Sequence, residues 1–153
     1  MVDKQRQGRL NKAAGARFET KVREDLKAKG WFVSKFQSNV EFETDDYSKG
    51  ALIPSKHKYN PFIRSYSLGS GFPDFIAYRK IMKGVRGHYM IIGVEAKSNG
   101  FLTKLEKMKC VWLLDNNAFS KILIAKKKKE GRKIIVEYDD FKDKYYDKYK
   151  NSL

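Results

Sequence analysis

Two spacings of apolar residues divide this chain into segments typical of helices and of strands. Over 12–29 the apolar positions, Phe18 and Leu26 among them, recur at every third or fourth residue, which predicts a helix that Asn11 caps at its N-terminus. The same spacing over 101–115 predicts a second helix. Each stripe is flanked by polar positions, so each helix should turn one side toward a core.

Short runs rich in β-branched and aromatic residues predict the strands. They cover 31–37, 74–80, 88–97, 120–126 and 133–138. Short connections that contain glycine join the second run to the third and the fourth to the fifth, which predicts two hairpins. A terminal helix over 139–150, capped by Asp139 or Asp140, completes the order.

Two segments carry no helical or strand period. Residues 1–11 are polar and basic, and we expect them to form a flexible basic arm. Residues 38–70 hold acids, prolines and tyrosines and predict a long loop insertion, in which VEFET could form a short hairpin. A chain of 153 residues has the length of one domain, so the expected fold is α/β over 1–153, with a central mixed sheet flanked by helices.

The charge of the chain narrows the choice of partner. Thirty-three Lys and Arg against eighteen Asp and Glu give a net charge of +15, which favours a polyanion such as nucleic acid. A single cysteine excludes a disulfide framework and a cysteine-based zinc module. No apolar run approaches the ~20 residues of a membrane span, and no signal peptide is visible, so we expect a cytoplasmic protein without a membrane partner.

Candidate chemistry gathers where two predicted strands meet. Asp74 follows Pro73 at the start of one strand, and Glu95 and Lys97 close the next strand on a shared face, because side chains alternate along a strand. In a hairpin the start of the first strand lies beside the end of the second. Asp74 should therefore meet Glu95 and Lys97.

Two carboxylates brought together in this way repel each other, and a divalent cation relieves the repulsion. Mg²⁺ or Mn²⁺ held by Asp74 and Glu95 would polarise a phosphate oxygen and lower the pKa of a water, while Lys97 would orient that water or neutralise developing charge. The set suffices for metal-assisted phosphodiester hydrolysis. The alternatives are a turn role for Asp74 and a solvated ion pair for Glu95 with Lys97, which the apolar stretch MIIGV disfavours.

These residues resemble a known motif. Pro73-Asp74 followed by Glu95-Ala96-Lys97 is similar to the motif of the PD-(D/E)xK, or restriction-endonuclease-like, nucleases. The strings GSGFPDFIAYR and MIIGVEAKSNGFLTKLEKMKCVWL most resemble archaeal Holliday-junction resolvases and the related VRR-type nucleases. The resemblance spans 13–37 and 69–126 and implies a restriction-endonuclease-like core of the order α-β-β-β-α-β.

The resemblance also implies two further catalytic residues. Glu19, in GARFETKV on the first helix, matches the acid that completes the metal site, and Ser70 matches a recurrent loop serine; each could instead be an ordinary surface or loop residue. Family members often carry Gln early in the second helix, where this chain offers Glu106 or Lys107.

By this resemblance, the expected function is a Mg²⁺-dependent endonuclease that cuts branched DNA in recombination or repair and acts as a homodimer. One alternative is a VRR-type nuclease that acts on flaps or single strands. The other is a basic nucleic-acid-binding module without catalysis.

Basic residues are the candidates for contact with phosphates. Those expected to bind nucleic acid are Arg9, Lys12, Lys56, Arg64, Lys126, Lys127, Lys128, Lys129 and Arg132. The run that starts at Lys126 is predicted to lie at a hairpin tip, where the alternative is a merely solvated turn.

Overall fold

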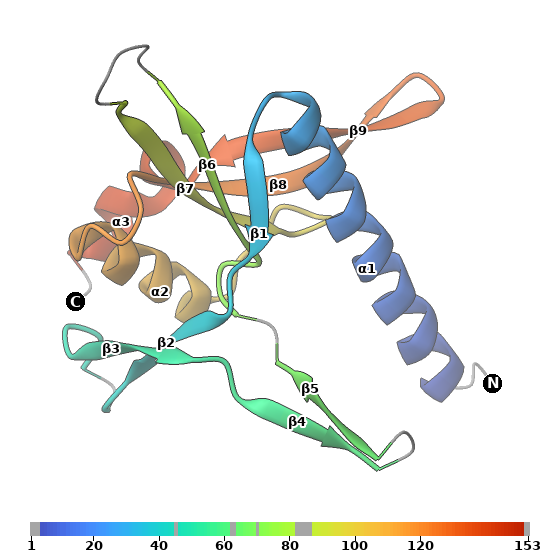
Figure 1. The fold of residues 1–153 in the computed structure, drawn as a ribbon, viewed down its shortest axis with the longest axis horizontal. Coiled ribbons are helices and arrows are strands. Elements are labelled where there is room, and N and C mark those ends of the chain that lie inside the picture. The colour runs from blue at the N-terminus through green and yellow to red at the C-terminus, as the bar shows by residue number, and fades with distance from the viewer. Residues whose placement is uncertain (1–3, 45, 62–63, 70, 82–86, 152–153) are drawn as a thin grey trace.

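The computed structural model describes residues 4–44, 46–61, 64–69, 71–81 and 87–151 (Figure 1). Its elements are α1 (Lys4–Ala28), β1 (Phe32–Lys35), β2 (Ser38–Phe42), β3 (Gly50–Pro54), β4 (His57–Asn60), β5 (Ser65–Leu68), β6 (Phe75–Lys80), β7 (Tyr89–Ala96), α2 (Lys104–Asp115), β8 (Lys121–Glu130), β9 (Lys133–Asp140), a π-helical turn η1 (Lys142–Tyr146) and α3 (Asp147–Lys150).

The central sheet has five strands in the order β1-β6-β7-β8-β9. β7 and β8 are parallel, whereas the other neighbouring pairs are antiparallel. α2 lies between β7 and β8 in the sequence and supplies the crossover that a parallel pair requires. The hairpins β2–β3 and β4–β5 form two separate small sheets. The predicted mixed sheet flanked by helices is confirmed, as are the two hairpins β6–β7 and β8–β9.

A helix covers each face of the sheet. On one face α1 buries Phe18, Val22 and Leu26. These side chains belong to a core with the strand residues Phe75, Ala77, Ile92, Val94, Ala125 and Val136. Because only the second half of α1 contributes to this core, its first half extends beyond the sheet (Figure 1).

The opposite face packs against α2 and the C-terminal segment. This second core contains Cys110, Val111, Leu113, Ile122, Ile124 and Phe141, with Val40 of β2 and Phe72 of the loop before β6. Side chains of β8 therefore alternate between the two cores, as the period of a strand requires. Side chains on both faces are buried in the second half of β7 and the first half of β8, which explains the apolar runs there, whereas residues 127–130 at the end of β8 are exposed.

The prediction of a flexible arm over 1–11 is wrong for the part that the structure describes, because α1 begins at Lys4 and continues through Asn11. Asn11 is not a cap; its Oδ1 accepts a hydrogen bond from Nε2 of Gln7 at 2.9 Å. Every residue over 4–13 is exposed, so no apolar period marks this part of the helix, which depends on the intrinsic propensity of its Lys, Arg, Gln and Ala residues. The start of the predicted arm, residues 1–3, lies outside the described residues.

The prediction of a loop over 38–70 is also wrong, because this segment folds into two hairpins. The predicted short hairpin around VEFET corresponds to β2, which pairs with β3. The second hairpin places Tyr59 of β4 opposite Tyr66 of β5. The acids and prolines that suggested a loop lie mainly at strand ends and in turns; Pro54, for example, ends β3.

The predicted terminal helix begins later than expected. β9 continues to Asp140 and pairs Asp139 with Ile124 of β8, so neither aspartate caps a helix. The helical segment follows Phe141, which is fully buried. Strand pairing and the burial of Phe141 outweigh the local capping preference of the two aspartates.

Gly71 allows the loop before β6 to pass close to the end of β1. A Cβ at this position would overlap the carbonyl oxygens of Phe36 and Ser38. The backbone N–H of Phe72 also donates to the carbonyl oxygen of Ser38 at 2.9 Å. This close approach fixes the path of the chain three residues before Asp74.

We therefore expect Gly71→Ala to lower the free energy of unfolding by about 1–3 kcal/mol, because the added methyl group forces the backbone apart. Gly15→Ala is the matched control, since nothing lies within 4 Å of a Cβ at that position of α1. The control should raise stability by about 0.5–1 kcal/mol through helix propensity. Urea denaturation measures both, and an unchanged midpoint for Gly71→Ala would contradict the close approach.

Candidate active site

Asp74 and Glu95 exchange hydrogen bonds across the start of β6 and the end of β7. The register pairs Phe75 with Val94, which sets Asp74 beside Glu95. The backbone N–H of Asp74 donates to Oε2 of Glu95 at 3.0 Å, and the backbone N–H of Ala96 donates to Oδ2 of Asp74 at 2.9 Å. The two predicted acids are therefore brought together as the hairpin argument requires.

Strand alternation determines which way these acids point. Phe75 and Val94 belong to the core under α1, and both are fully buried. Their neighbours Asp74 and Glu95 therefore face the α2 side, where Lys97 follows two residues after Glu95. The apolar residues that hold the hairpin in register thus also determine the position of its acids.

Both carboxyls are largely removed from water. Asp74 is 9% exposed and Glu95 is 5% exposed. Burial raises the pKa of Asp74, and the hydrogen bond from Ala96 offsets part of this. Burial, and after it repulsion from Asp74, raises the pKa of Glu95 from its ordinary value near 4.5 to about 8. Two acids held in this way need a cation to be charged together.

Lys97 is held between two carboxylates. Its Nζ lies 3.4 Å from Oε1 of Glu95 and donates to Oε1 of Glu106 at 2.7 Å. Partial burial acts to lower the pKa of Lys97, but the hydrogen bond to Glu106 and the charge of Glu95 outweigh it and leave this pKa above its ordinary value. Lys97 is therefore a cation at neutral pH.

The N-terminus of α2 determines where Glu106 lies. Thr103 caps the helix: its hydroxyl accepts from the backbone N–H of Glu106 at 3.3 Å, and Oε2 of Glu106 accepts from the backbone N–H of Thr103 at 2.7 Å. This capping box leaves Oε1 of Glu106 for Lys97. Of the two residues that the sequence offered at this place, Glu106 reaches the site, whereas Lys107 lies over the rings of Tyr145 and Tyr149.

Glu19 approaches the same site from α1 and forms an ion pair with Lys35 of β1. Its charge contributes to the raised pKa of Asp74, and Lys35 acts in the opposite direction. Ser70, the other residue taken from the resemblance, lies outside the described residues.

A cavity of about 410 Å³ opens over these groups. It is lined by Glu19, Asn39, Gly71, Phe72, Asp74, Glu95, Ala96, Lys97, Thr103, Leu105, Glu106 and Lys109. All the predicted catalytic residues that the structure describes therefore face one cavity. Within the described part of the chain, no cluster of three or more His, Cys, Asp or Glu side chains has the arrangement of a metal site. Asp74 and Glu95 thus form a two-carboxylate site, and a third ligand from Glu19 remains a prediction.

The predicted phosphate-binding residues are dispersed. Lys126 is paired with Glu137 at 3.1 Å and Asp139 at 2.9 Å, and Lys128 with Glu137 at 2.7 Å, so acids of β9 offset part of this basic run. The run lies along β8 rather than at a hairpin tip, because β8 extends to Glu130.

The remaining basic candidates lie apart from the carboxylates. Arg9 and Lys12 lie on the exposed half of α1, and Arg64 precedes β5. Lys127 lies over the ring of Phe18, while Lys129 and Arg132 are exposed near the β8–β9 turn. None of these residues lines the cavity over Asp74 and Glu95, and Lys56 lines a second cavity instead.

The sequence did not indicate three residues of the site. Lys35 lies in β1, and the alternation of side chains along this strand could have predicted that Lys35 lies on the same side of the sheet as Glu19. Asn39 and Lys109 line the cavity together, and Nζ of Lys109 donates to Oδ1 of Asn39 at 2.8 Å. Their contact joins α2 to the β2–β3 hairpin, which was predicted as a loop.

The raised pKa of Glu95 predicts a distinctive dependence of stability on pH. Between its ordinary value near 4.5 and about 8 the folded chain binds the Glu95 proton more tightly than the unfolded chain, so this stabilisation is lost as the pH rises. In EDTA, Glu95→Gln should therefore gain stability relative to the wild type between pH 5 and pH 8, by more than about 1 kcal/mol. Urea denaturation at several pH values measures the difference.

Glu24→Gln, at an exposed position of α1, is the control and should give a curve parallel to the wild type. Parallel curves for Glu95→Gln as well would show that Glu95 is not held as a buried acid.

Comparison with known proteins gives no further assignment. In the part of the chain that the structure describes, no helix has the length and apolar character needed to cross a membrane. No family model, no curated protein and no solved structure matches the chain.

Proposed function

We propose that this chain is a Mg²⁺- or Mn²⁺-dependent endonuclease that hydrolyses phosphodiester bonds in branched DNA. The observation that carries the proposal is the buried pair of Asp74 and Glu95, joined by reciprocal hydrogen bonds and adjoined by the cationic Lys97. Titratable groups in a cavity whose pKa values are shifted by burial and by a specific charged neighbour are candidates for a functional site.

The order of the elements around this pair supports the proposal. α1, β1, β6, β7, α2 and β8 follow one another as helix, three antiparallel strands, helix and parallel strand. This succession is similar to the α-β-β-β-α-β order implied by the resemblance to restriction-endonuclease-like nucleases, and that similarity supports the proposal. The hairpins β2–β3 and β4–β5 interrupt that order between β1 and β6.

Two carboxylates fit the requirements of Mg²⁺. The ion is usually held by one or two carboxylates, and waters and substrate phosphates complete its coordination. Asp74 uses Oδ2 and Glu95 uses Oε2 for the exchanged hydrogen bonds, which directs one oxygen of each group into the backbone. When bound, the ion would polarise the phosphodiester and lower the pKa of a water.

The other residues of the cavity would serve binding and charge. Lys97 is protonated, so it would neutralise charge that develops on the phosphate and cannot accept a proton from water. Glu106 holds Lys97 in place, which makes it a positioning residue. Glu19 would contribute from α1, either to the ion or through its ion pair with Lys35.

The substrate and assembly belong to the proposal as well. The net charge of +15 favours DNA over a small anionic substrate. Cleavage of two strands at a junction would require two copies of the site, so we propose a homodimer.

Cleavage assays with four-way junctions, flaps, single strands and linear duplexes show which of these substrates the protein prefers. Symmetric nicks near the junction centre would support branched DNA.

We expect Asp74→Asn to abolish cleavage in Mg²⁺ while DNA binding is retained, because the amide keeps the hydrogen bond from Ala96 but loses the charge that an ion needs. Asp143→Asn removes one charge at an exposed position of η1 and should cut DNA like the wild type. Gel assays of cleavage and binding measure both. Undiminished cleavage by Asp74→Asn would disprove the site, and wild-type protein that binds without cutting in Mg²⁺ or Mn²⁺ would favour a binding module.

Lys97→Met should reduce the cleavage rate by roughly 10²–10³, the usual effect of removing one charge-stabilising group. Lys107→Met is the matched control on α2, because its Nζ lies over tyrosine rings and outside the cavity. Single-turnover cleavage rates measure both variants. A rate for Lys97→Met as high as that for Lys107→Met would exclude a catalytic role for Lys97.

A further inference from the structure

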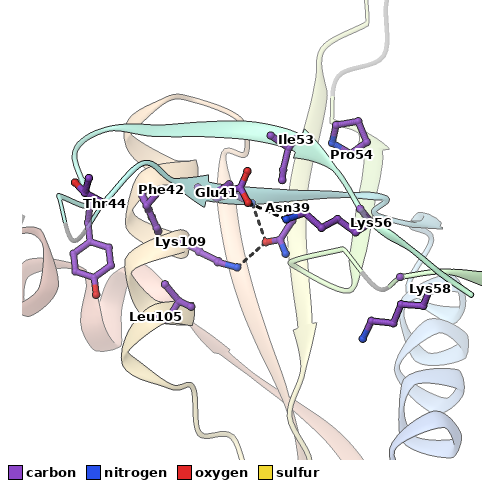
Figure 2. A pocket seen from close by; sticks show the side chains of 14 residues that line it. Asn39, Glu41, Phe42, Thr44, Ile53, Pro54, Lys56, Lys58, Leu105 and Lys109 are labelled. Atoms are coloured by element: carbon purple, nitrogen blue, oxygen red, sulfur yellow. Dashed lines mark hydrogen bonds and ion pairs between the residues drawn. The ribbon is translucent and has the colours of Figure 1, made fainter.

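A second cavity of about 610 Å³ adjoins the candidate active site. It lies between the β2–β3 hairpin, the segment that follows β3, and α2 (Figure 2). Asn39, Leu105 and Lys109 line both cavities, so the two are adjacent. A polymer that leaves the first cavity on the side of these three residues would enter the second.

The walls of the second cavity combine apolar surface with positive charge. Val40, Phe42, Tyr47, Ile53, Pro54 and Leu105 supply the apolar surface. Lys56, Lys58 and Lys109 supply the charge; Lys56 is paired with Glu41 at 3.1 Å, and Lys109 extends toward Asn39 (Figure 2). Apolar side chains beside cations suit a ligand that combines an apolar face with a negative charge.

We propose that this second cavity binds an unpaired nucleotide of the DNA strand that is cut, next to the cleaved linkage. The proposal rests on the nuclease function and specifies its substrate: the strand must be single-stranded at this position. A nucleotide matches the cavity in both respects, because its base presents a flat face and its phosphate a charge, whereas a paired base could not enter.

The β4–β5 hairpin projects from the rim of this cavity. Lys58 of β4 and Gly69 after β5 both line the cavity, so the base of the hairpin forms its rim. Tyr59 and Tyr66 lie opposite each other with ring centroids 5.1 Å apart, and they are 54% and 69% exposed. Because side chains alternate along a strand, these rings lie on the face of the hairpin opposite to Lys58. Exposed aromatic rings are stacking sites for single-stranded bases, so they offer a second contact to a strand that leaves the cavity around the hairpin.

Filling the cavity tests the proposal. Ile53 lines it, whereas the preceding residue, Leu52, is exposed and does not, so Ile53→Trp and Leu52→Trp form a matched pair on β3. Fluorescence anisotropy in EDTA, with a labelled single-stranded oligonucleotide and its duplex, measures binding without cleavage. We expect the wild type to prefer the single strand, Ile53→Trp to weaken that binding about tenfold or more, and Leu52→Trp to change it by less than about twofold.

A double variant covers the case in which Ile53→Trp does not fold. Tyr59→Ala with Tyr66→Ala removes exposed rings and should weaken binding of the single strand about tenfold. Tyr78→Ala with Tyr89→Ala removes another exposed pair, on β6 and β7, and should leave that binding unchanged.

The outcomes separate this proposal from the nuclease function. Equal affinity for single strand and duplex, or no loss in Ile53→Trp and in the Tyr59 and Tyr66 variant, would overturn the proposal even if the wild type cuts DNA in Mg²⁺. Loss of single-strand binding in Ile53→Trp and in the Tyr59 and Tyr66 variant, with binding retained in the control variants, would support the proposal even if no cleavage is observed. Only the nuclease function would then fail.

Discussion

The candidate site depends on one exchange of hydrogen bonds, in which Asp74 and Glu95 each accept from the backbone of the other's strand. The exchange requires β6 and β7 to be paired in the observed register, since a shift of one strand by one residue would turn its acid toward α1 and leave the two acids on opposite faces of the sheet. Apolar residues under α1, such as Phe75 and Val94, fix that register. The core on one face of the sheet thus holds two acids together on the other.

The buried acids are flanked by two ion pairs from opposite sides of the sheet. Glu19 with Lys35 approaches from α1 and β1, and Lys97 with Glu106 joins the end of β7 to α2. Each pair places a cation near the acids and a carboxylate beside that cation. This arrangement limits the repulsion between the buried acids without neutralising both, as the binding of a divalent cation that we propose would require.

Much of this site could be predicted from the sequence because it depends on strand periodicity. Two apolar runs with a short connection predict a hairpin, and the hairpin brings the start of one strand to the end of the other, which is sufficient to place Asp74 beside Glu95. The helical spacing of Phe18, Val22 and Leu26 likewise places Glu19 beside the buried stripe. Each inference uses residues that are neighbours in sequence or in one hairpin.

The remaining features depend on contacts that no local pattern records. The first turns of α1 bury nothing and so show no apolar period, although they are helical. The contact between Asn39 and Lys109 spans 70 positions and exists only because the β2–β3 hairpin packs near α2. Asp139 and Asp140 resemble helix caps in the sequence, but pairing with β8 keeps them in β9.

Binding of Mn²⁺, followed by electron paramagnetic resonance, tests the site most directly when the wild type is compared with a variant that carries Asp74→Asn and Glu95→Gln. The wild type should bind Mn²⁺ specifically, and the double variant should lack this binding although it remains folded. Equal binding by the two proteins, or none by the wild type even with an oligonucleotide present, would contradict the claim that these two acids hold a divalent cation.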